Sequence, residues 1–580
     1  MTQPTTVPGS SATAANFLLE GMMEAGMPRL FCNLGTDHVT LIEELARWKS
    51  EGKALPDIFL CPHENVAVHM AGGYAMATGE GQAVMVHVDA GTANSAMALH
   101  NLFRGRVPVM LIAGRSPFTL HGELKGSRDN YVHFVQDPFD IASLVRPYIK
   151  WEYSLPDGVV AKEVVRRAHS VMQSDPPGPV YLTLARETLA MTRAAADVAS
   201  FPERLYGAVQ RGGIDSDTCR TIADKLAAAR NPIVITSYLG RNPQAVASLE
   251  RLAASCAMPV YEVNPTALNI SRKSRWFGGY QADRAMADAD LVLLLDVDVP
   301  WLPKYAALNP GASYVQIDVD AIKADFPLWG FGAEIRVQAD CGKALDQLHE
   351  QLQATKREGF DERVAERTRL RTLALDARGA GKRPIPAGNA DGAVDIEQVF
   401  SCLAGLLADE DVVVNEAIRN ANALLEQVPR VLPRTYFANA GGGLGFSGGV
   451  ALGVKLANPG ARVVQVVGDG SYHFSAPTAV YAMAQQYRLP ILTIVLDNGG
   501  WRAVKEAVLR VHGDGIAAAT DQFMAKLEGE TRDFEKVGEA FGAHGDVIRT
   551  SGDIMPALKR CLEMVDSGRA AVLRVVLAPI

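Results

Sequence analysis

Two stretches of the sequence decide the fold: RVVQVVGDGS at 462–471 and ILTIVLDNGG at 491–500. Each starts as a run of aliphatic residues with the length of a buried strand, and each ends in glycine beside a polar side chain. The helical pattern between them, after Pro477, predicts a strand–helix–strand unit with parallel strands. The polar ends of both strands are then expected at one edge of a sheet, where open α/β sheets bind ligands.

The same alternation of short apolar runs and helical patterns extends outward over the 580 residues. It predicts an α/β protein of three domains, each a doubly wound parallel sheet: N-terminal at 10–190, central at 205–350 and C-terminal at 390–580. A segment at 191–211, and a charged stretch at 356–378 that passes into 379–388, separate the domains. The expected strands are 57–61, 83–88, 108–113 and 179–184, then 232–237, 259–263, 290–296 and 312–317, then 411–415, 462–467, 491–496 and 571–577.

The composition is that of an ordinary globular protein, with 48% hydrophobic residues, 21% charged residues and a formal net charge of −8. No dense block of Lys and Arg favours a nucleic-acid or acidic-membrane partner, so a small-molecule substrate is expected. No apolar run approaches the roughly 20 residues of a membrane helix, and the N-terminus lacks a signal-peptide pattern, which predicts a cytoplasmic protein. The seven cysteines lack CxxC pairs and are expected to be reduced.

The ends of the two quoted strands carry the residue types that hold a metal ion and a diphosphate. Carboxylate, amide and main-chain carbonyl oxygens are the hard ligands that Mg²⁺ prefers, which predicts Asp469, Asn498 and Gly500 as ligands. The glycines allow a phosphate to approach the backbone, near a helix expected to begin at about 475–477. Either motif alone would more often be a tight turn, but the two together favour a site. The expected contacts are Gly468, Asp469, Gly470, Ser471, Asn498 and Gly500.

With these residues the chain resembles the thiamine-diphosphate-dependent enzymes, whose signature is Gly-Asp-Gly and, further on, Asn-Asn. Asp497 stands here where the first Asn is common, and Asn498 matches the second, which is the family's metal ligand. The resemblance covers almost the whole chain and is closest to the branch of acetolactate synthase, benzoylformate decarboxylase and oxalyl-CoA decarboxylase. It implies thiamine diphosphate and Mg²⁺ as cofactors, a pyrimidine-binding N-terminal domain and a diphosphate-binding C-terminal domain.

The resemblance also implies roles for residues upstream in the third domain. In NAGGGLGFSGGVALGV at 439–454, Leu444 matches the apolar residue that wedges between the two rings of the cofactor. The carbonyl of Gly442 would then accept a hydrogen bond from the cofactor's amino group. Asn415 and Glu416 resemble a second diphosphate-binding segment. Taken alone, the glycine-rich segment could equally be a helix start that packs closely.

In the first domain, HENVAVHMAGGYAMATG at 63–79 resembles the family helix that carries the activating acid. The resemblance implies that Glu64 binds the pyrimidine ring, so that the cofactor can act as its own base. Alone, a Glu at this position would be explained by the helix dipole. The family places this acid and the metal site on different subunits, which implies a homodimer or homotetramer with active sites at the subunit interface.

Four further positions are implied to border the substrate. His87, followed after two residues by Ala-Gly-Thr, resembles the proton-relaying histidine of benzoylformate decarboxylase, although a lone histidine is more often a core residue. Thr36 follows the first strand and would face the substrate carboxylate. Gln136 and Trp501 would line the pocket. A turn, a helix cap or core packing is the alternative explanation for these last three.

The reaction implied by the resemblance is decarboxylation of a 2-oxo acid, whose product is either protonated to an aldehyde or joined to a second carbonyl compound. An acetolactate-synthase-like enzyme is the leading interpretation, and a benzoylformate-decarboxylase-like decarboxylase or a 2-hydroxyacyl-CoA lyase is the alternative. The segment LDVDVPW at 295–301 lacks the Gly-Ala-Arg-like pattern of flavin-binding acetolactate synthases, so flavin (FAD) is not expected. A catalytically inactive cofactor-binding regulator is a third interpretation. An NAD-dependent oxidoreductase is disfavoured, because no Gly-x-Gly-x-x-Gly closes a strand.

Overall fold

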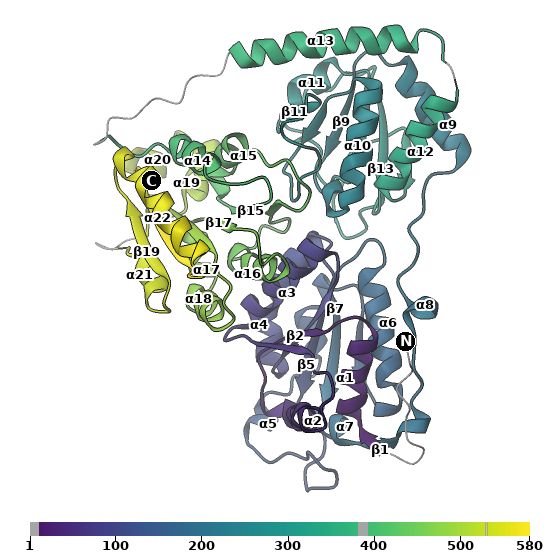
Figure 1. Cartoon of the computed structure of the whole chain (residues 1–580), viewed down its shortest axis with the longest axis vertical. Helices are drawn as coiled ribbons and strands as arrows, with labels where there is room; N and C mark the ends of the chain where they lie inside the picture. Colours follow the sequence, from purple (N-terminus) through teal and green to yellow (C-terminus); the bar gives the residue numbers. More distant parts are fainter. Residues whose placement is uncertain (1–10, 356, 381–391, 528, 530–531) are drawn as a thin grey trace.

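The computed structural model describes residues 11–355, 357–380, 392–527, 529 and 532–580. It contains three α/β domains, each built on a parallel six-stranded sheet with helices packed on its faces (Figure 1). The predicted fold class is therefore confirmed. Most of the predicted passage at 379–388 lies outside the described residues, as do residue 10 and residues 390–391 at the predicted domain starts. None of the described helices has the length and apolar character needed to cross a bilayer.

The N-terminal domain has the strand order β3-β2-β4-β5-β7-β6. Strand β4 lies inside the sheet and all five of its residues are buried, as expected for a strand covered on both faces. The strands are β2 (Arg29–Cys32), β3 (Asp57–Leu60), β4 (Gln82–Val86), β5 (Val109–Arg115), β6 (Glu152–Leu155) and β7 (Val180–Ala185); the main helices are α1 (Ala14–Glu24), α2 (Val39–Ser50), α3 (Glu64–Thr78), α4 (Val88–Arg104) and α6 (Ala161–Gln173).

The central domain has the order β11-β10-β9-β12-β13-β14. The charged stretch at 356–378 is largely helical: α13 (Phe360–Ala380) runs along the top of Figure 1 towards the C-terminal domain. The buried Arg367 anchors this helix by donating to the carbonyl of Cys256 at 2.8 Å. The strands are β9 (Pro232–Thr236), β10 (Val260–Glu262), β11 (Phe277–Gly279), β12 (Leu291–Leu295), β13 (Ser313–Asp318) and β14 (Ile335–Gln338).

The C-terminal domain has the order β16-β15-β17-β18-β20-β19. The helix expected to begin at about 475–477 is α18, which starts at Pro477, and a short helix that was not predicted, α17, starts at Asp469 directly after β17. The elements are β15 (Val412–Glu416), β16 (Tyr436–Ala438), β17 (Val463–Gly468), β18 (Leu492–Asp497), β19 (His544–Ile548), β20 (Ala571–Val576), α16 (Ser447–Ala457), α17 (Asp469–Phe474), α18 (Pro477–Gln486) and α22 (Ile554–Asp566).

The N-terminal and C-terminal domains share one hydrophobic core, in which α3 packs directly on α16. The two backbones touch: a Cβ at Gly73 would lie 2.3 Å from the Val450 carbonyl oxygen, and one at Gly453 would lie 2.0 Å from that of Met70. Only glycine permits this approach, because any side chain would collide with the main chain of the other helix. The two domains are therefore joined along α3 and α16 by an interlocked helix pair.

Candidate functional site

The two strand ends quoted first lie side by side. Strands β17 and β18 are paired in parallel, with Gly468 opposite Leu496. The buried Asp469 carboxylate crosses from one end to the other: Oδ2 accepts hydrogen bonds from the amides of Gly499 at 2.8 Å and Gly500 at 2.9 Å, and Oδ1 accepts from Gly470 at 2.7 Å. Burial raises the pKa of Asp469. Both loops are thus fixed around one carboxylate.

The other predicted metal and diphosphate residues surround Asp469. The Asn498 side-chain oxygen accepts from the Gly500 amide at 3.2 Å, and the Gly500 carbonyl accepts from Arg502 at 3.2 Å. The buried Ser471 lies in α17, and Gly468 precedes its first turn. Asp469, Asn498 and Gly500 therefore belong to one hydrogen-bonded turn, and their carboxylate, amide and carbonyl oxygens are the types of ligand that suit Mg²⁺.

Asp497, which replaces the family's more common Asn, is a buried acid with two arginine partners. Arg574 donates to it at 2.8 Å and Arg532 at 3.0 Å. Neither arginine was predicted from the sequence. An ion pair of Arg574 could have been predicted, because it is the single charged residue in the strand 571–576 and a buried charge requires a partner.

Glu416 and Asn415 lie at the end of β15 but are bonded within the protein. The Glu416 carboxylate accepts from the amides of Gly445 at 2.7 Å and Ser447 at 2.9 Å, and from the Ser447 hydroxyl at 2.6 Å. Burial raises the pKa of Glu416. Asn415 donates to the Tyr436 hydroxyl at 2.9 Å. Glu416 therefore holds the first turn of α16, which forms the second half of the predicted ring-binding segment at 439–454.

The first part of that segment, 439–444, is held from the N-terminal domain by α4. Asn101 binds both main-chain polar groups of one residue: its oxygen accepts from the Gly443 amide and its nitrogen donates to the Gly443 carbonyl, each at 3.0 Å. His100 lies 2.7 Å from the Gly441 carbonyl. Gly442, with φ of 77°, is exposed, and Leu444 is half-buried. No sequence motif marks Asn101, since it lies in a helix with an ordinary pattern.

Glu64, the predicted activating acid, is the first residue of α3. Its carboxylate is half-buried and accepts from the side chain of Asn94, on α4, at 3.1 Å. His63 caps the helix by accepting from the Asn65 amide at 3.1 Å. The Glu64 carboxylate therefore projects from the carboxyl edge of the N-terminal sheet.

The remaining N-terminal residues gather at the same sheet edge. His87 Nδ1 lies 2.6 Å from the buried carboxylate of Asp37, and the Gln136 side chain also reaches the His87 ring. Thr36 makes a long contact of 3.5 Å with His133. Thr36 was the residue predicted in this loop, and its neighbour Asp37 was not predicted.

Trp501, predicted to border the substrate, lies against the turn at Gly470. A Cβ at Gly470 would lie 2.4 Å from the Trp501 indole nitrogen, so this position requires glycine for the ring to pack there. The Trp501 amide donates to the Ala525 carbonyl at 2.8 Å. Trp501 therefore covers the turn that carries Asp469.

The crevice at the carboxyl end of the central sheet is occupied by side chains of the protein itself. Lys323 is fully buried and lies 2.7 Å from Asp318, Asp298 and the Tyr238 hydroxyl. Arg106, from the N-terminal domain, donates to Asp298 at 2.7 Å and stacks on Tyr238. This ionic network joins the two domains at the place where doubly wound sheets usually bind a ligand.

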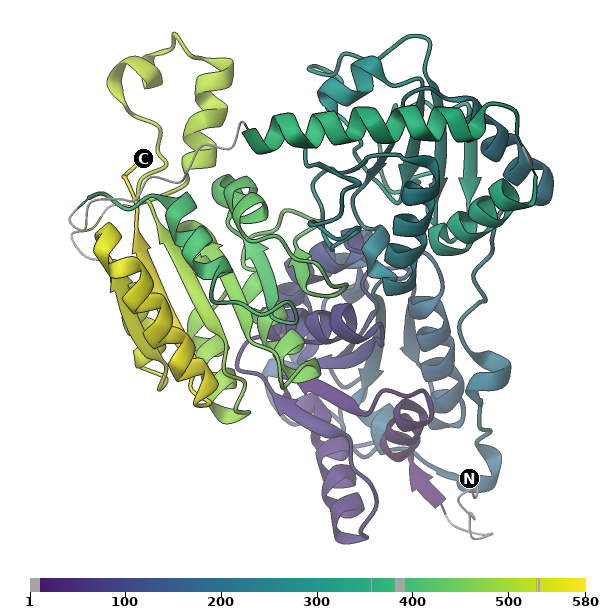
Figure 2. The same cartoon turned by 45° about the horizontal axis from the view of Figure 1, so that its top comes forward.

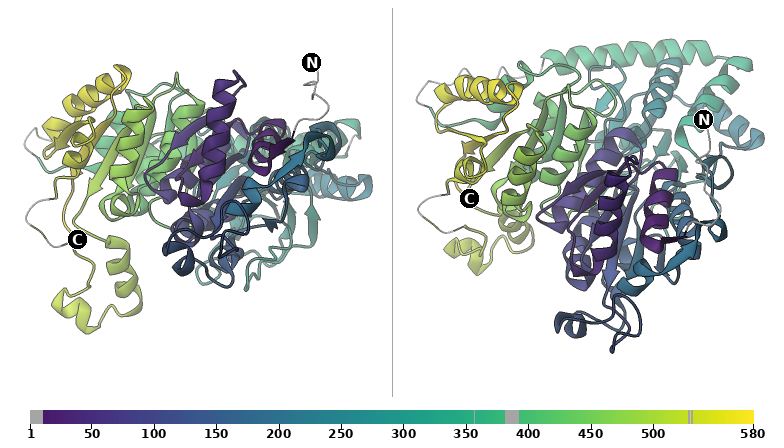
Figure 3. Two further views of the ribbon diagram at one scale, coloured as in Figure 1. Left: turned by 90° about the horizontal axis from the view of Figure 1, so that it is seen from below. Right: turned by 60° about the horizontal axis from the view of Figure 1, so that its bottom comes forward.

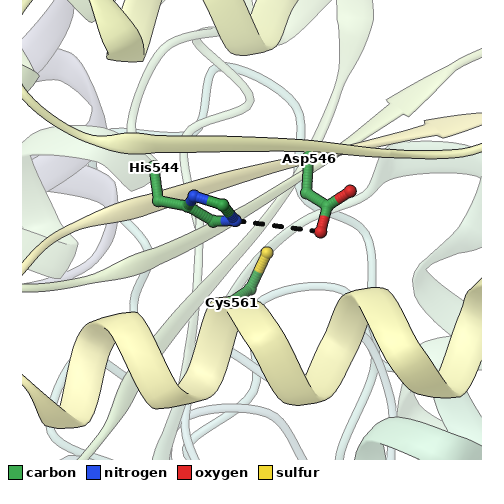
Figure 4. A group of neighbouring side chains, drawn as sticks. All are labelled: His544, Asp546 and Cys561. Carbon is green, nitrogen blue, oxygen red and sulfur yellow. Dashed lines mark ion pairs between the residues drawn. The ribbon is translucent and has the colours of Figure 1, made fainter.

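A separate group of potential metal ligands, His544, Asp546 and Cys561, lies between β19 and α22 (Figure 4). Arg560 already donates to Asp546 at 2.8 Å, and burial raises the pKa of Cys561 to about 12, so the thiol is protonated. The charge that a cation would require is thus largely neutralised. All seven cysteines are unpaired and six are buried, as expected for core thiols.

Comparison with protein families identifies all three domains. The N-terminal, central and C-terminal domain models of thiamine pyrophosphate enzymes match residues 12–144, 219–348 and 420–575. The chain therefore belongs to the thiamine pyrophosphate enzyme family, which confirms the resemblance seen in the sequence.

Curated relatives point to two activities within that family. A benzoylformate decarboxylase of Pseudomonas aeruginosa is 26% identical over 93% of this chain and 94% of its own length. The large subunit of acetolactate synthase isozyme 3 of Escherichia coli is 25% identical over 88% and 86%. The structure of a 4-hydroxybenzoylformate decarboxylase of Rhodococcus jostii covers 98% of this chain and 99% of its own, with a TM-score of 0.75 at 21% identity. This last likeness supports the fold alone.

Proposed function

We propose that the protein is a thiamine-diphosphate- and Mg²⁺-dependent enzyme that decarboxylates a 2-oxo acid, and either releases an aldehyde or joins the product to a second carbonyl compound. The supporting observation is the Asp469 carboxylate bonded to the amides of Gly499 and Gly500. When bound, thiamine diphosphate supplies the nucleophilic carbon and the electron sink for loss of carbon dioxide.

The C-terminal residues fit the phosphate end of this cofactor. Asp469, Asn498 and the Gly500 carbonyl would hold the ion, and the backbone at Gly468, where a Cβ would have no neighbour within 4 Å, leaves room for the diphosphate. Glu416 and Asn101 fix the segment that presents Leu444 to the rings. We assign Glu416 a positioning role rather than the predicted phosphate contact, because it is a buried carboxylate bonded to the first turn of α16, and a carboxylate would repel a phosphate.

The N-terminal residues fit the reacting end. Glu64 would donate or accept the proton at the pyrimidine nitrogen, which is the step that activates the cofactor. Thr36, Gln136 and Trp501 would border the substrate. His87 would move a proton to or from it. Flavin is not part of this proposal, because the central crevice contains the buried network around Lys323.

We further propose that two copies form the active sites. Exposed apolar side chains border each half: on the N-terminal half they lie in the segment 131–139, and on the C-terminal half in and around α19 (Arg502–Val511) and α20 (Ile516–Thr520), which project from the domain in Figures 2 and 3. Such patches mark interaction surfaces. The N-terminal half of one copy would therefore cover the C-terminal half of another. The exposed side chains are Tyr131, Phe134, Val135, Phe139, Val504, Leu509, Val511, Ile516 and Met524.

A substrate panel tests the proposal. Pyruvate, 2-oxobutanoate, benzoylformate and oxalyl-CoA, alone and with aldehydes, would be incubated with enzyme, thiamine diphosphate and Mg²⁺, and products identified by mass spectrometry. We expect carbon dioxide with an aldehyde or a hydroxy ketone from at least one 2-oxo acid, and loss of turnover after removal of the metal by chelation. Asp469→Asn should lower turnover at least about 100-fold, while the distant Asp546→Asn should not.

Tight cofactor binding without any product would favour the inactive regulatory interpretation. Full turnover after exhaustive removal of thiamine diphosphate would exclude the proposed function.

A further inference from the structure

The loop after β2 brings a buried acid against the predicted relay histidine. Asp37 lies in a short 3₁₀ turn (Thr36–His38), and its Oδ1 is 2.6 Å from His87 Nδ1. Its other oxygen accepts from the Val88 amide, the next residue along the chain, at 3.3 Å. One carboxylate therefore fixes both the imidazole ring and the backbone that carries it.

Two glycines make room for this pair. A Cβ at Gly35 would lie 2.0 Å from His87 Nδ1, and a Cβ at Gly114 would lie 1.5 Å from the Asp37 carboxylate. Val88 adopts φ of 32°, a value that a β-branched residue adopts only when its surroundings impose it. Three segments of the N-terminal domain thus shape one acid–histidine contact: the loop after β2, the β4–α4 junction and the end of β5.

We propose that Asp37 is the positioning residue of His87: it binds Nδ1–H and directs Nε2 to the substrate, so that His87 acts as a proton donor. This inference rests on the proposed function and deepens it. His87 would donate the Nε2 proton to the carbon that has lost carbon dioxide, become neutral, and regain a proton from solvent. The net reaction, a 2-oxo acid anion plus a proton giving an aldehyde and carbon dioxide, is balanced.

The surrounding charges agree with this assignment. The bond to Asp37 raises the pKa of His87 against the opposing effect of burial. Burial alone would raise the pKa of Asp37, but the bonds and charges of His38 and His87 hold it well below its usual range. The charged or titratable groups around the pair are His38 beside Asp37, Asp89 on α4, His133 on α5 (Val132–Val135) and Arg186 on α7 (Arg186–Ala190).

Histidine NMR on the cofactor-free protein provides the first test. The resonance of His87 would be assigned as the one that His87→Gln removes, and its titration followed in Asp37→Asn and in Asp89→Asn. Asp89 is the matched control, because it is a nearby carboxylate that does not bond to the ring. We expect Asp37→Asn to bring the His87 titration to a pH about one unit lower, and Asp89→Asn to change it much less. Equal changes in the two variants would overturn the proposal.

Kinetics provide the second test. A cationic donor is lost as the pH rises through its pKa, so the alkaline limb of kcat should move to lower pH in Asp37→Asn. In the His87→Gln background, Asp37→Asn should cause little further loss of kcat. A further loss as large as in the unsubstituted enzyme would show that Asp37 acts independently of His87. Failure of the enzyme to decarboxylate any acid would remove the proposed function, but the NMR result would still decide the pairing.

Discussion

The two halves of the site are built differently. In the C-terminal half the polar side chains bind the protein's own backbone: Asp469 holds the amides of Gly499 and Gly500, and Glu416 holds the first turn of α16. In the N-terminal half, His87 and Glu64 bond to side chains and remain half-buried. The carboxylates of the C-terminal half are therefore held in place by main-chain amides, whereas the N-terminal half presents groups that can exchange protons. Substitutions in the C-terminal half should accordingly alter stability as well as cofactor binding, whereas substitutions of Glu64 or His87 should alter mainly the chemistry.

The largest effect is expected at Glu64. Glu64→Gln keeps the size of the side chain but removes the acid, so hydrogen–deuterium exchange at C2 of bound thiamine should slow by about 100-fold to 10,000-fold, with the unfolding temperature unchanged. Exchange is followed by NMR after acid quench. Glu80→Gln, at the other, exposed end of α3, is the control and should exchange normally. Unchanged exchange in Glu64→Gln would remove this residue from its role.

The next largest effect is expected at Gly453, where α16 contacts α3. Gly453→Ala would place a Cβ 2.0 Å from the Met70 carbonyl oxygen, and neither backbone can yield. We expect the free energy of unfolding to fall by about 1 to 3 kcal/mol, measured by urea denaturation. Gly460→Ala, where a Cβ would have no neighbour within 4 Å, is the control. Equal stability of the two variants would mean that the helix pair is not tightly packed.

The smallest effect is expected at Asp497, in the C-terminal half. Asp497→Asn restores the family's common residue but leaves Arg574 without its buried anion, so we expect a loss of about 1 kcal/mol in unfolding free energy. Asp533→Asn removes the more exposed partner of the same arginine and should cost less. A larger loss for Asp533→Asn would show that Arg574 depends on its outer partner instead.

How much of the fold was predictable depended on position in the sheet. Strands β17 and β18 are covered on both faces, so their apolar runs predicted them to within a residue or two. Strands β6, β14 and β19 lie at sheet edges, and each keeps partly exposed positions, so no apolar run marked them. Pairing with a neighbour, rather than their own pattern, makes them strands.

The candidate site, like the fold, was predictable only where a local sequence pattern marks its residues. Asp469 and Asn498 were predictable because glycine and polar residues at strand ends form a local pattern. Asp37 was not, since the choice between it and Thr36 depends on the turn that directs only one of them at His87. The role of Asn101 depends on a contact across two domains, which no local pattern encodes.

The interlocked helices α3 and α16 have a consequence for an assembled enzyme. Helix α3 begins with Glu64, and α16 begins just after Leu444, so one rigid body carries both residues. If the sites form between copies as proposed, this Glu64 serves one catalytic centre while this Leu444 serves the other. A movement of this rigid body that closes one catalytic centre would then also displace a residue of the other centre. Substrate binding at the two centres of a pair would therefore not be independent.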